Sequence, residues 1–148
     1  MRHKASGHFE LPIPAADAIG FFTPEGERSW APGWDPTYPA GDPTETPGTV
    51  FITSHGETKT VWVIEQIDRA AHTSAFSRFT PGHHAGTVRV RCDDQPDDHC
   101  IVSVEYDMTA LSASHPQILD AYTQESFTAM MKEWATRVTA TLSPQART

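Results

Sequence analysis

His55 is the side chain of this sequence best suited to acid–base chemistry, because an unperturbed imidazole titrates near neutral pH. It ends the run Val50 to His55, whose β-branched and aromatic residues are typical of a strand. If His55 shares the face of Phe51 and Thr53, it points into the protein and is a candidate general acid or base. The alternative is a histidine at the end of a hairpin that faces water.

Arg78 is a second candidate, because it interrupts the apolar, strand-like segment 76–79. A guanidinium that points inward could hold a carboxylate or enolate oxygen of a ligand with its N–H donors. Projection into solvent is the alternative, and it is the more common arrangement for an arginine.

The adjacent residues His83 and His84 invite comparison with a metal site. Neighbouring strand residues point to opposite faces, so the two imidazoles cannot readily bind one ion together. No further Cys, His or Asp stands at a spacing that would complete a zinc site. We therefore interpret the pair as a polar turn, and we expect neither a metal nor a cofactor.

Carboxylates gather in two places along the chain. Four aspartates fall within residues 93–98. They lack the spacing of an EF-hand, so we interpret them as a solvated acidic turn rather than a calcium site. Glu25 and Glu27 could form an acid–base pair, although early glutamates more often complement the N-terminal dipole of a short helix.

Cys92 and Cys100 are the only two cysteines. A hairpin that closes at 93–99 would place them opposite each other on the buried face. They could form a redox pair, or they could fill the core as two small apolar side chains. We favour the core role, because free cysteines are usually buried and intracellular thiols stay reduced.

The composition argues against several classes of protein. A length of 148 residues predicts one domain spanning 1–148. The net charge of −8 and the three lysines disfavour binding to nucleic acid or to an anionic membrane. No apolar run reaches the ~20 residues of a membrane span, and no secretory signal follows the N-terminus, so we expect a cytoplasmic protein. Nucleotide-binding and hydrolase motifs such as a P-loop or G-x-S-x-G are also absent from the sequence.

Apolar periodicity predicts the elements that would position these residues. A period of two predicts strands. They are expected at 4–11, 49–55, 59–68, 72–80, 85–92 and 99–109. Two short helices, at 15–22 and 24–30, are expected after the first strand, followed by an ordered loop over 31–48 that carries Trp34 and Tyr38.

A long amphipathic helix is predicted to end the chain. Ser114 or His115 would cap it, Pro116 would occupy its first turn, and Pro144 would stop it. Its apolar stripe consists of Phe127, Met130, Met131, Trp134, Val138 and Leu142. An antiparallel sheet that packs one face on a single helix gives an α+β fold.

The order of a strand, two short helices, about five further strands and a long helix resembles the helix-grip fold of the START-related SRPBCC superfamily. The resemblance is carried by residues 23–30, 32–36 and 127–134 and by the strand pair around Phe51 and Trp62. It covers nearly the whole chain and implies a curved antiparallel sheet wrapped on the C-terminal helix, with a cavity between them. The superfamily includes polyketide cyclase/dehydrase-like proteins, pollen-allergen relatives and lipid-transfer domains, so the fold alone does not identify the function.

The resemblance makes the aromatic, methionine and polar residues around that cavity the expected ligand-binding residues, because such side chains suit apolar ligands. They are Trp34, His55, Trp62, Arg78, Tyr106, Met108, Tyr122, Met130 and Trp134. The alternative for the aromatic residues among them is a filled core without a cavity.

Three functional hypotheses follow. The first is a carrier or sensor of a small hydrophobic or aromatic molecule, favoured by the absence of a catalytic motif. The second is a polyketide cyclase/dehydrase-like enzyme that uses His55 or a tyrosine as its acid or base. The third is a protein-interaction module of the chaperone-activator type, with residues 30–38 as its contact surface. A cavity with convergent polar groups would favour the enzyme, a smooth apolar cavity the carrier, and a filled core the interaction module. The oligomeric state stays open, with a dimer as one alternative.

Overall fold

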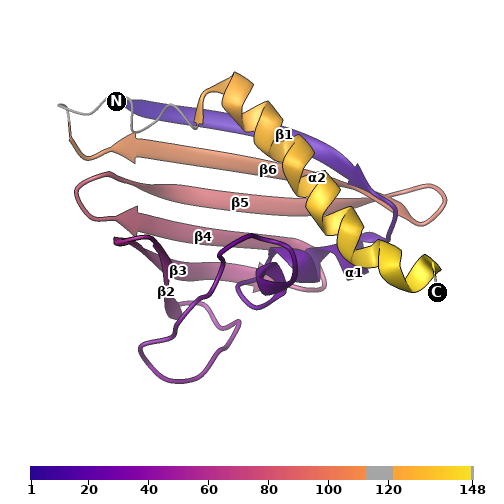
Figure 1. Cartoon of the computed structure of the whole chain (residues 1–148), viewed down its shortest axis with the longest axis horizontal. Coiled ribbons are helices and arrows are strands. Elements are labelled where there is room, and N and C mark those ends of the chain that lie inside the picture. Colours follow the sequence, from indigo (N-terminus) through magenta and orange to yellow (C-terminus); the bar gives the residue numbers. More distant parts are fainter. Residues whose placement is uncertain (113–121, 148) are drawn as a thin grey trace.

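The computed structural model of the protein describes residues 1–112 and 122–147. Six antiparallel strands form one sheet in the order β1-β6-β5-β4-β3-β2. Helix α2 crosses one face of this sheet, which we call the inner face (Figure 1). The elements are β1 (Arg2–Leu11), α1 (Ala15–Ala18), η1 (Ile19–Phe22), η2 (Gly26–Ser29), β2 (Val50–His55), β3 (Thr58–Asp68), β4 (Thr73–Thr80), β5 (His84–Gln95), β6 (His99–Ala110) and α2 (Gln124–Arg147). The predicted α+β class and order of elements are confirmed.

Alternation along each strand decides which residues face the helix. On β6, Val102, Val104, Tyr106 and Met108 are buried, as predicted. On β5, Arg89 lies on the opposite face and is exposed. Because successive side chains of a strand point to opposite faces, this period of two places the core on the helix side of the sheet.

The hairpin of β5 and β6 has a different register from the predicted one. Cys92 pairs with Val102, and Cys100 pairs with Asp94, so the expected direct pairing of the two cysteines is wrong by two residues. The reason is that β5 continues to Gln95, which shortens the turn. A shift of two keeps every side chain on its face, and both cysteines are free and buried. Burial raises the pKa of Cys92 to about 12, which disfavours a reactive thiolate.

The four aspartates of the acidic tip are exposed, as expected of a solvated turn, but one of them also holds a neighbouring element. Asp94 lies within β5, and its Oδ1 accepts a hydrogen bond of 2.8 Å from the backbone N–H of Ala15, the first residue of α1. Asp97 and Asp98 form the turn itself, with left-handed φ angles of 65° and 58°, a conformation that aspartate tolerates better than most residues. The hairpin therefore anchors the short helix that follows β1.

Helix α2 packs most closely against β1, at Gly7. A Cβ atom added to Gly7 would lie 2.8 Å from Cγ of Met131 and 3.4 Å from two ring carbons of Phe127. Phe127, Met131 and Val138 are buried as predicted, and Trp134 is half-buried. A residue without a side chain on β1 thus lets the helix approach the sheet at this edge.

Both ends of the long helix differ from the prediction. The helix begins at Gln124, so Tyr122 and Thr123 precede it, and the predicted cap at 114–116 lies outside the described residues. At the other end it passes Pro144 and reaches Arg147. A proline in the last turn removes only one late backbone hydrogen bond, so the predicted stop at Pro144 is wrong. No helix of the described residues is long and apolar enough to cross a membrane.

Gly7→Ala tests the close approach of helix and strand. The added methyl group would lie only 2.8 Å from Cγ of Met131, so we expect a loss of about 1–3 kcal/mol in the free energy of unfolding. Urea denaturation of the variant and of Ser6→Ala, an exposed neighbour on the same strand, measures the effect. Equal stability of the two variants would contradict this packing.

Candidate functional site

A cavity of about 410 Å³ lies between the inner face of the sheet, α2 and the loop that follows η2. Its apolar lining consists of Trp30, Ala31, Pro32, Trp34, Trp62, Met130 and Trp134. Its polar lining includes Glu27, Thr53, Thr60, Arg78 and Tyr106. Exposed residues such as His55 and Glu133 stand at its rim. A second hollow of about 590 Å³ lies on the outer face, but it is lined by exposed polar residues such as Arg89 and Arg91 and by no aromatic side chain.

Two clusters of aromatic rings contribute side chains to the lining of the cavity. One cluster comprises Phe22, Trp30, Tyr106, Tyr122, Phe127 and Trp134. The other comprises Trp34, Tyr38, Phe51, Trp62 and Phe76. Within the first, the ring centroids of Trp30 and Trp134 are 5.2 Å apart. The edge-to-face and offset geometries within both clusters are those that aromatic rings prefer, so the walls are well packed.

Arg78 lies between the two clusters. Its guanidinium carbon is 4.6 Å from the ring centroid of Trp62, and it lines the cavity together with Tyr106. Its Nε is buried and has no hydrogen-bond partner among the described residues. The alternation of β4 explains the inward direction, since Phe76 is buried whereas Phe79 is 44% exposed. Projection into solvent, the commoner arrangement for an arginine, is therefore wrong here.

Glu27 reaches the cavity from η2. Burial raises the pKa of its carboxyl to about 8 against the opposing effect of the Arg78 charge. At neutral pH the carboxyl therefore keeps its proton and can donate a hydrogen bond. From the sequence we expect Glu27 to complement the dipole of a short helix, but its side chain lines the cavity. This position depends on how η2 packs against the sheet. The spacing of three residues between Glu27 and Trp30 was the one indication in the sequence that both share a face.

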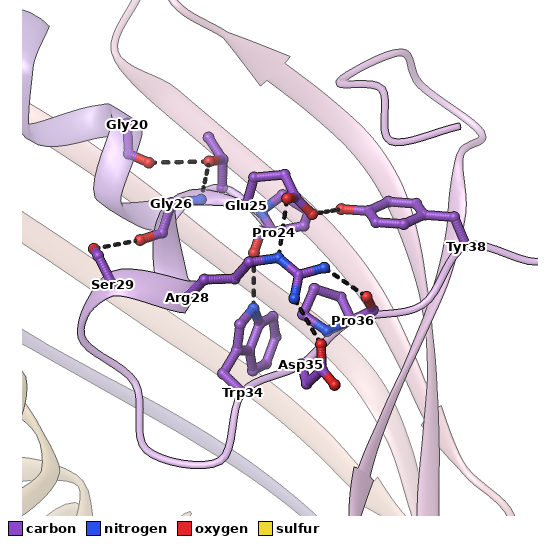
Figure 2. Close-up of polar contacts among 11 residues, drawn as sticks. Gly20, Pro24, Glu25, Gly26, Arg28, Ser29, Trp34, Asp35, Pro36 and Tyr38 are labelled. Carbon is purple, nitrogen blue, oxygen red and sulfur yellow. Dashed lines mark hydrogen bonds and ion pairs between the residues drawn. The ribbon is translucent and has the colours of Figure 1, made fainter. Parts of the chain in front are cut away.

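A network of polar contacts holds η2 and the following loop together (Figure 2). Arg28 donates hydrogen bonds to Oε1 of Glu25 (2.9 Å), Oδ1 of Asp35 (2.6 Å) and the carbonyl of Pro36 (2.7 Å). The hydroxyl of Tyr38 donates to Oε2 of Glu25 at 2.7 Å. Exposed ion pairs contribute little one by one, but linked pairs order a segment. The network thus holds the part of the loop next to Asp35 and Pro36 against η2, beside the cavity.

Trp34 is the cavity residue that this network fixes. Its indole N–H donates a hydrogen bond of 2.8 Å to the carbonyl of Pro24 (Figure 2). Its ring packs edge-to-face on Trp62, with centroids 5.5 Å apart. Trp30 is held in a similar way, because its indole N–H donates to the carbonyl of Phe21 at 2.8 Å. Both tryptophans therefore have satisfied polar atoms and offer only apolar ring surface.

His55 lies on the inner face, as its parity with Phe51 predicts, but it is also exposed. Both alternatives for this residue hold in part, because the strand ends there and the side chain stands at the rim of the cavity. A role for His55 as acid or base stays a prediction.

His83 and His84 do not form a polar turn. His83 is exposed, whereas His84 begins β5 on the inner face and is only 9% exposed. The hydroxyl of Tyr122 is 3.4 Å from its Nε2. Its Nδ1 is buried with no partner within the part of the chain that the structure describes. Burial first, and the nearby charges of Arg78 and His83 second, lower the pKa of His84 to about 4. The imidazole is therefore neutral at physiological pH.

The structure brings most of the expected ligand-binding residues together. Those that line the cavity are Trp34, His55, Trp62, Arg78, Tyr106, Met130 and Trp134. The other two lie nearby: Met108 is fully buried, and Tyr122 stacks on Tyr106 with ring centroids 5.5 Å apart. Sequence reasoning offered Glu27 only as one half of an acid–base pair with Glu25, and it placed neither Glu27 nor Trp30 among the ligand-binding residues. Neither alternation nor a motif marks a short helix as part of a cavity wall.

Solved structures with a similar backbone place this architecture among known proteins. Norcoclaurine synthase from Thalictrum flavum in complex with dopamine and hydroxybenzaldehyde superposes with a TM-score of 0.62 at 11% identity, over 93% of this chain and 87% of that one. Ara h 8.0201 superposes with a TM-score of 0.63 at 14% identity, over 97% of this chain and 99% of that one. The Zhui aromatase/cyclase from Streptomyces sp. R1128 superposes with a TM-score of 0.62 at 11% identity, over 92% of this chain and 93% of that one.

The chain has the helix-grip fold that these solved structures share. Its sheet order, short helices after β1 and long C-terminal helix are those of these helix-grip structures, as the resemblance implied. No protein-family model and no curated protein sequence matches this helix-grip chain. At these levels of sequence identity the agreement concerns the backbone, so the residues of the cavity have to be interpreted by their own chemistry.

The raised pKa of Glu27 predicts a pH-dependent stability. Its carboxyl titrates near 4.5 in the unfolded chain and near 8 in the folded protein. Between these values the folded state holds one more proton, so stability falls as the pH rises. Glu27→Gln keeps the shape but cannot ionise. The Tm of the variant minus the Tm of the natural protein should therefore increase as the pH rises from about 5 to about 9.

The other charged groups of the cavity wall are Arg78 on β4 and the pair Glu133 and Arg137 on α2. Thermal melts of Glu57→Gln, an exposed glutamate in the β2–β3 turn, serve as the control and should follow the natural protein at every pH. A difference between Glu27→Gln and the natural protein that does not change with pH would contradict the titration of Glu27.

Proposed function

We propose that the protein binds one small aromatic molecule in the cavity between the sheet and α2. The observation that carries the proposal is that all four tryptophans of the chain line this one hollow of about 410 Å³. Concave sites of about 300–1,000 Å³ with aromatic walls are the usual binding sites of small molecules. Flat indole faces offer a large contact area to an aromatic ring at little entropic cost.

The fold supports the same proposal. One similar structure is that of norcoclaurine synthase in complex with dopamine and hydroxybenzaldehyde, two aromatic molecules. Another is an aromatase/cyclase. Such likeness extends only to the backbone, so the substrates of those proteins are not transferred to this chain. What supports an aromatic ligand here is the tryptophan lining.

An enzyme that moves protons on a bound carbonyl compound is the second candidate. It is favoured by Glu27 and Arg78, which both line the cavity. A carboxyl with a pKa of about 8 can exchange a proton near neutral pH, and a guanidinium can stabilise an oxygen that gains negative charge. A cyclase/dehydrase-like reaction would use both groups, with Tyr106 as a further hydrogen-bond donor.

The interaction-module hypothesis receives less support. It required a filled core and an exposed aromatic loop at 30–38. Trp30 is buried, and Trp34 is half-buried against Phe51 and Trp62. The loop therefore turns its large side chains toward the cavity, where they do not offer an external contact patch.

Filling the cavity tests the proposed binding. Met130 lies on its wall, so Met130→Trp should occupy the space and weaken binding of 2-methylnaphthalene by roughly tenfold or more. Quenching of the tryptophan fluorescence, or the thermal shift caused by the probe, gives the affinity.

Ala129→Trp is the matched control, because Ala129 is the adjacent and exposed residue of the same helix. This variant should bind the probe as the natural protein does. If the natural protein binds neither 2-methylnaphthalene nor the corresponding carboxylate, 2-naphthoate, or if both variants bind the probe equally well, the proposed site is wrong.

A further inference from the structure

We propose that His84 and Arg78 form a carboxylate-binding subsite at one end of the cavity, so that the ligand is an aromatic carboxylate. This inference rests on the proposed function, because it places a polar group on the aromatic molecule that the tryptophans hold. It concerns a histidine that looks like part of a turn in the sequence.

The two residues are neighbours on the inner face. Arg78 on β4 pairs with Gly86 on β5, and His84 precedes that glycine by two residues. His84 and Arg78 are therefore diagonal neighbours on adjacent strands, with both side chains pointing to the same face. Gly86 itself carries no side chain, and the sulfur of Met108 lies 2.8 Å from where a Cβ of Gly86 would stand. Arg78 and Tyr106 line the cavity, so the pair adjoins it.

Each residue has one buried polar atom without a partner among the described residues. These atoms are Nε of Arg78 and Nδ1 of His84. Buried donors and acceptors are almost always hydrogen-bonded, and leaving one unpaired costs about 1–3 kcal/mol. Two such atoms on adjacent strands indicate that a ligand group satisfies both.

The hydrogen bonds around His84 decide what it offers. The phenol of Tyr122 lies 3.4 Å from Nε2, and a phenol O–H that donates to Nε2 leaves the ring proton on Nδ1. Burial keeps the ring neutral, since it lowers the pKa of His84 to about 4. Nδ1–H of His84 and Nε–H of Arg78 are then two unpartnered donors on adjacent strands of the inner face.

Two unpartnered donors on one face, one of them from a guanidinium, match the two oxygens of a carboxylate. Arginine supplies the charge that a desolvated anion needs. The contact of Arg78 with the ring of Trp62, at 4.6 Å, holds the guanidinium in place without using Nε. A neutral hydrocarbon of the same shape would leave both donors unpaired, so the subsite discriminates between the two kinds of ligand.

The test compares 2-naphthoate with 2-methylnaphthalene, which differ only in the group aimed at the subsite. In the natural protein we expect 2-naphthoate to bind roughly tenfold more tightly or better. His84→Phe keeps a ring of similar size but lacks Nδ1–H. It should weaken 2-naphthoate by roughly fivefold or more and leave 2-methylnaphthalene within about twofold. His83→Phe, at the exposed neighbour, should change neither affinity.

A second measurement covers the case in which His84→Phe does not fold. In the natural protein labelled with ¹⁵N-histidine, the Nδ1 resonance of His84 should show an attached proton. It should shift when 2-naphthoate is added and stay in place with 2-methylnaphthalene. A proton on Nε2 instead, or a shift with both probes, would overturn the subsite.

The outcomes separate the two proposals. If neither probe binds, the aromatic cavity and the subsite both fail. If both probes bind with equal affinity, or if His84→Phe weakens both to the same extent, the subsite is wrong while the aromatic cavity stands.

Discussion

One straight helix has to cover a sheet of six strands, and this mismatch shapes the rest of the protein. Helix α2 makes its closest contact at the β1 edge, where Gly7 leaves room for Met131. It crosses the face obliquely, so β3 and β4 lie farther from it (Figure 1). Other groups must cover those strands, because an exposed apolar sheet face is unfavourable. The short helices, the loop over 31–48 and large aromatic side chains do so, and they leave the cavity between them.

The ordered loop gives the cavity a fixed wall. Arg28 ties η2 to the loop through Glu25, Asp35 and Pro36 (Figure 2), and Trp34 is held to Pro24. Because both indoles of this wall already have hydrogen-bond partners, little conformational entropy remains to be lost when a ligand arrives. Preorganisation of this kind is what turns a hollow into a binding site.

Burial between the sheet and its covering elements also determines the protonation states of Glu27 and His84. Glu27 and His84 are both kept neutral by burial, the one with a raised and the other with a lowered pKa, because a charged group loses solvation away from water. The guanidinium of Arg78 lies over the ring of Trp62, a favourable cation–π contact. The cavity thus combines the carboxyl of Glu27 and the guanidinium of Arg78 with apolar walls.

The sequence by itself determined the order of the elements, the α+β class and the face of nearly every strand residue. Those features follow from local periodicity, and even the misplaced register of Cys92 and Cys100 kept both residues inside, since a shift of two preserves the face. Only the tertiary structure decided that Arg78 and His84 are enclosed, that Glu27 reaches the cavity from η2 and that α2 passes Pro144. Burial of a charged or polar side chain depends on neighbours that are distant in sequence, such as Trp62 over Arg78 and Tyr122 beside His84. Alternation along a single strand contains no information about those neighbours.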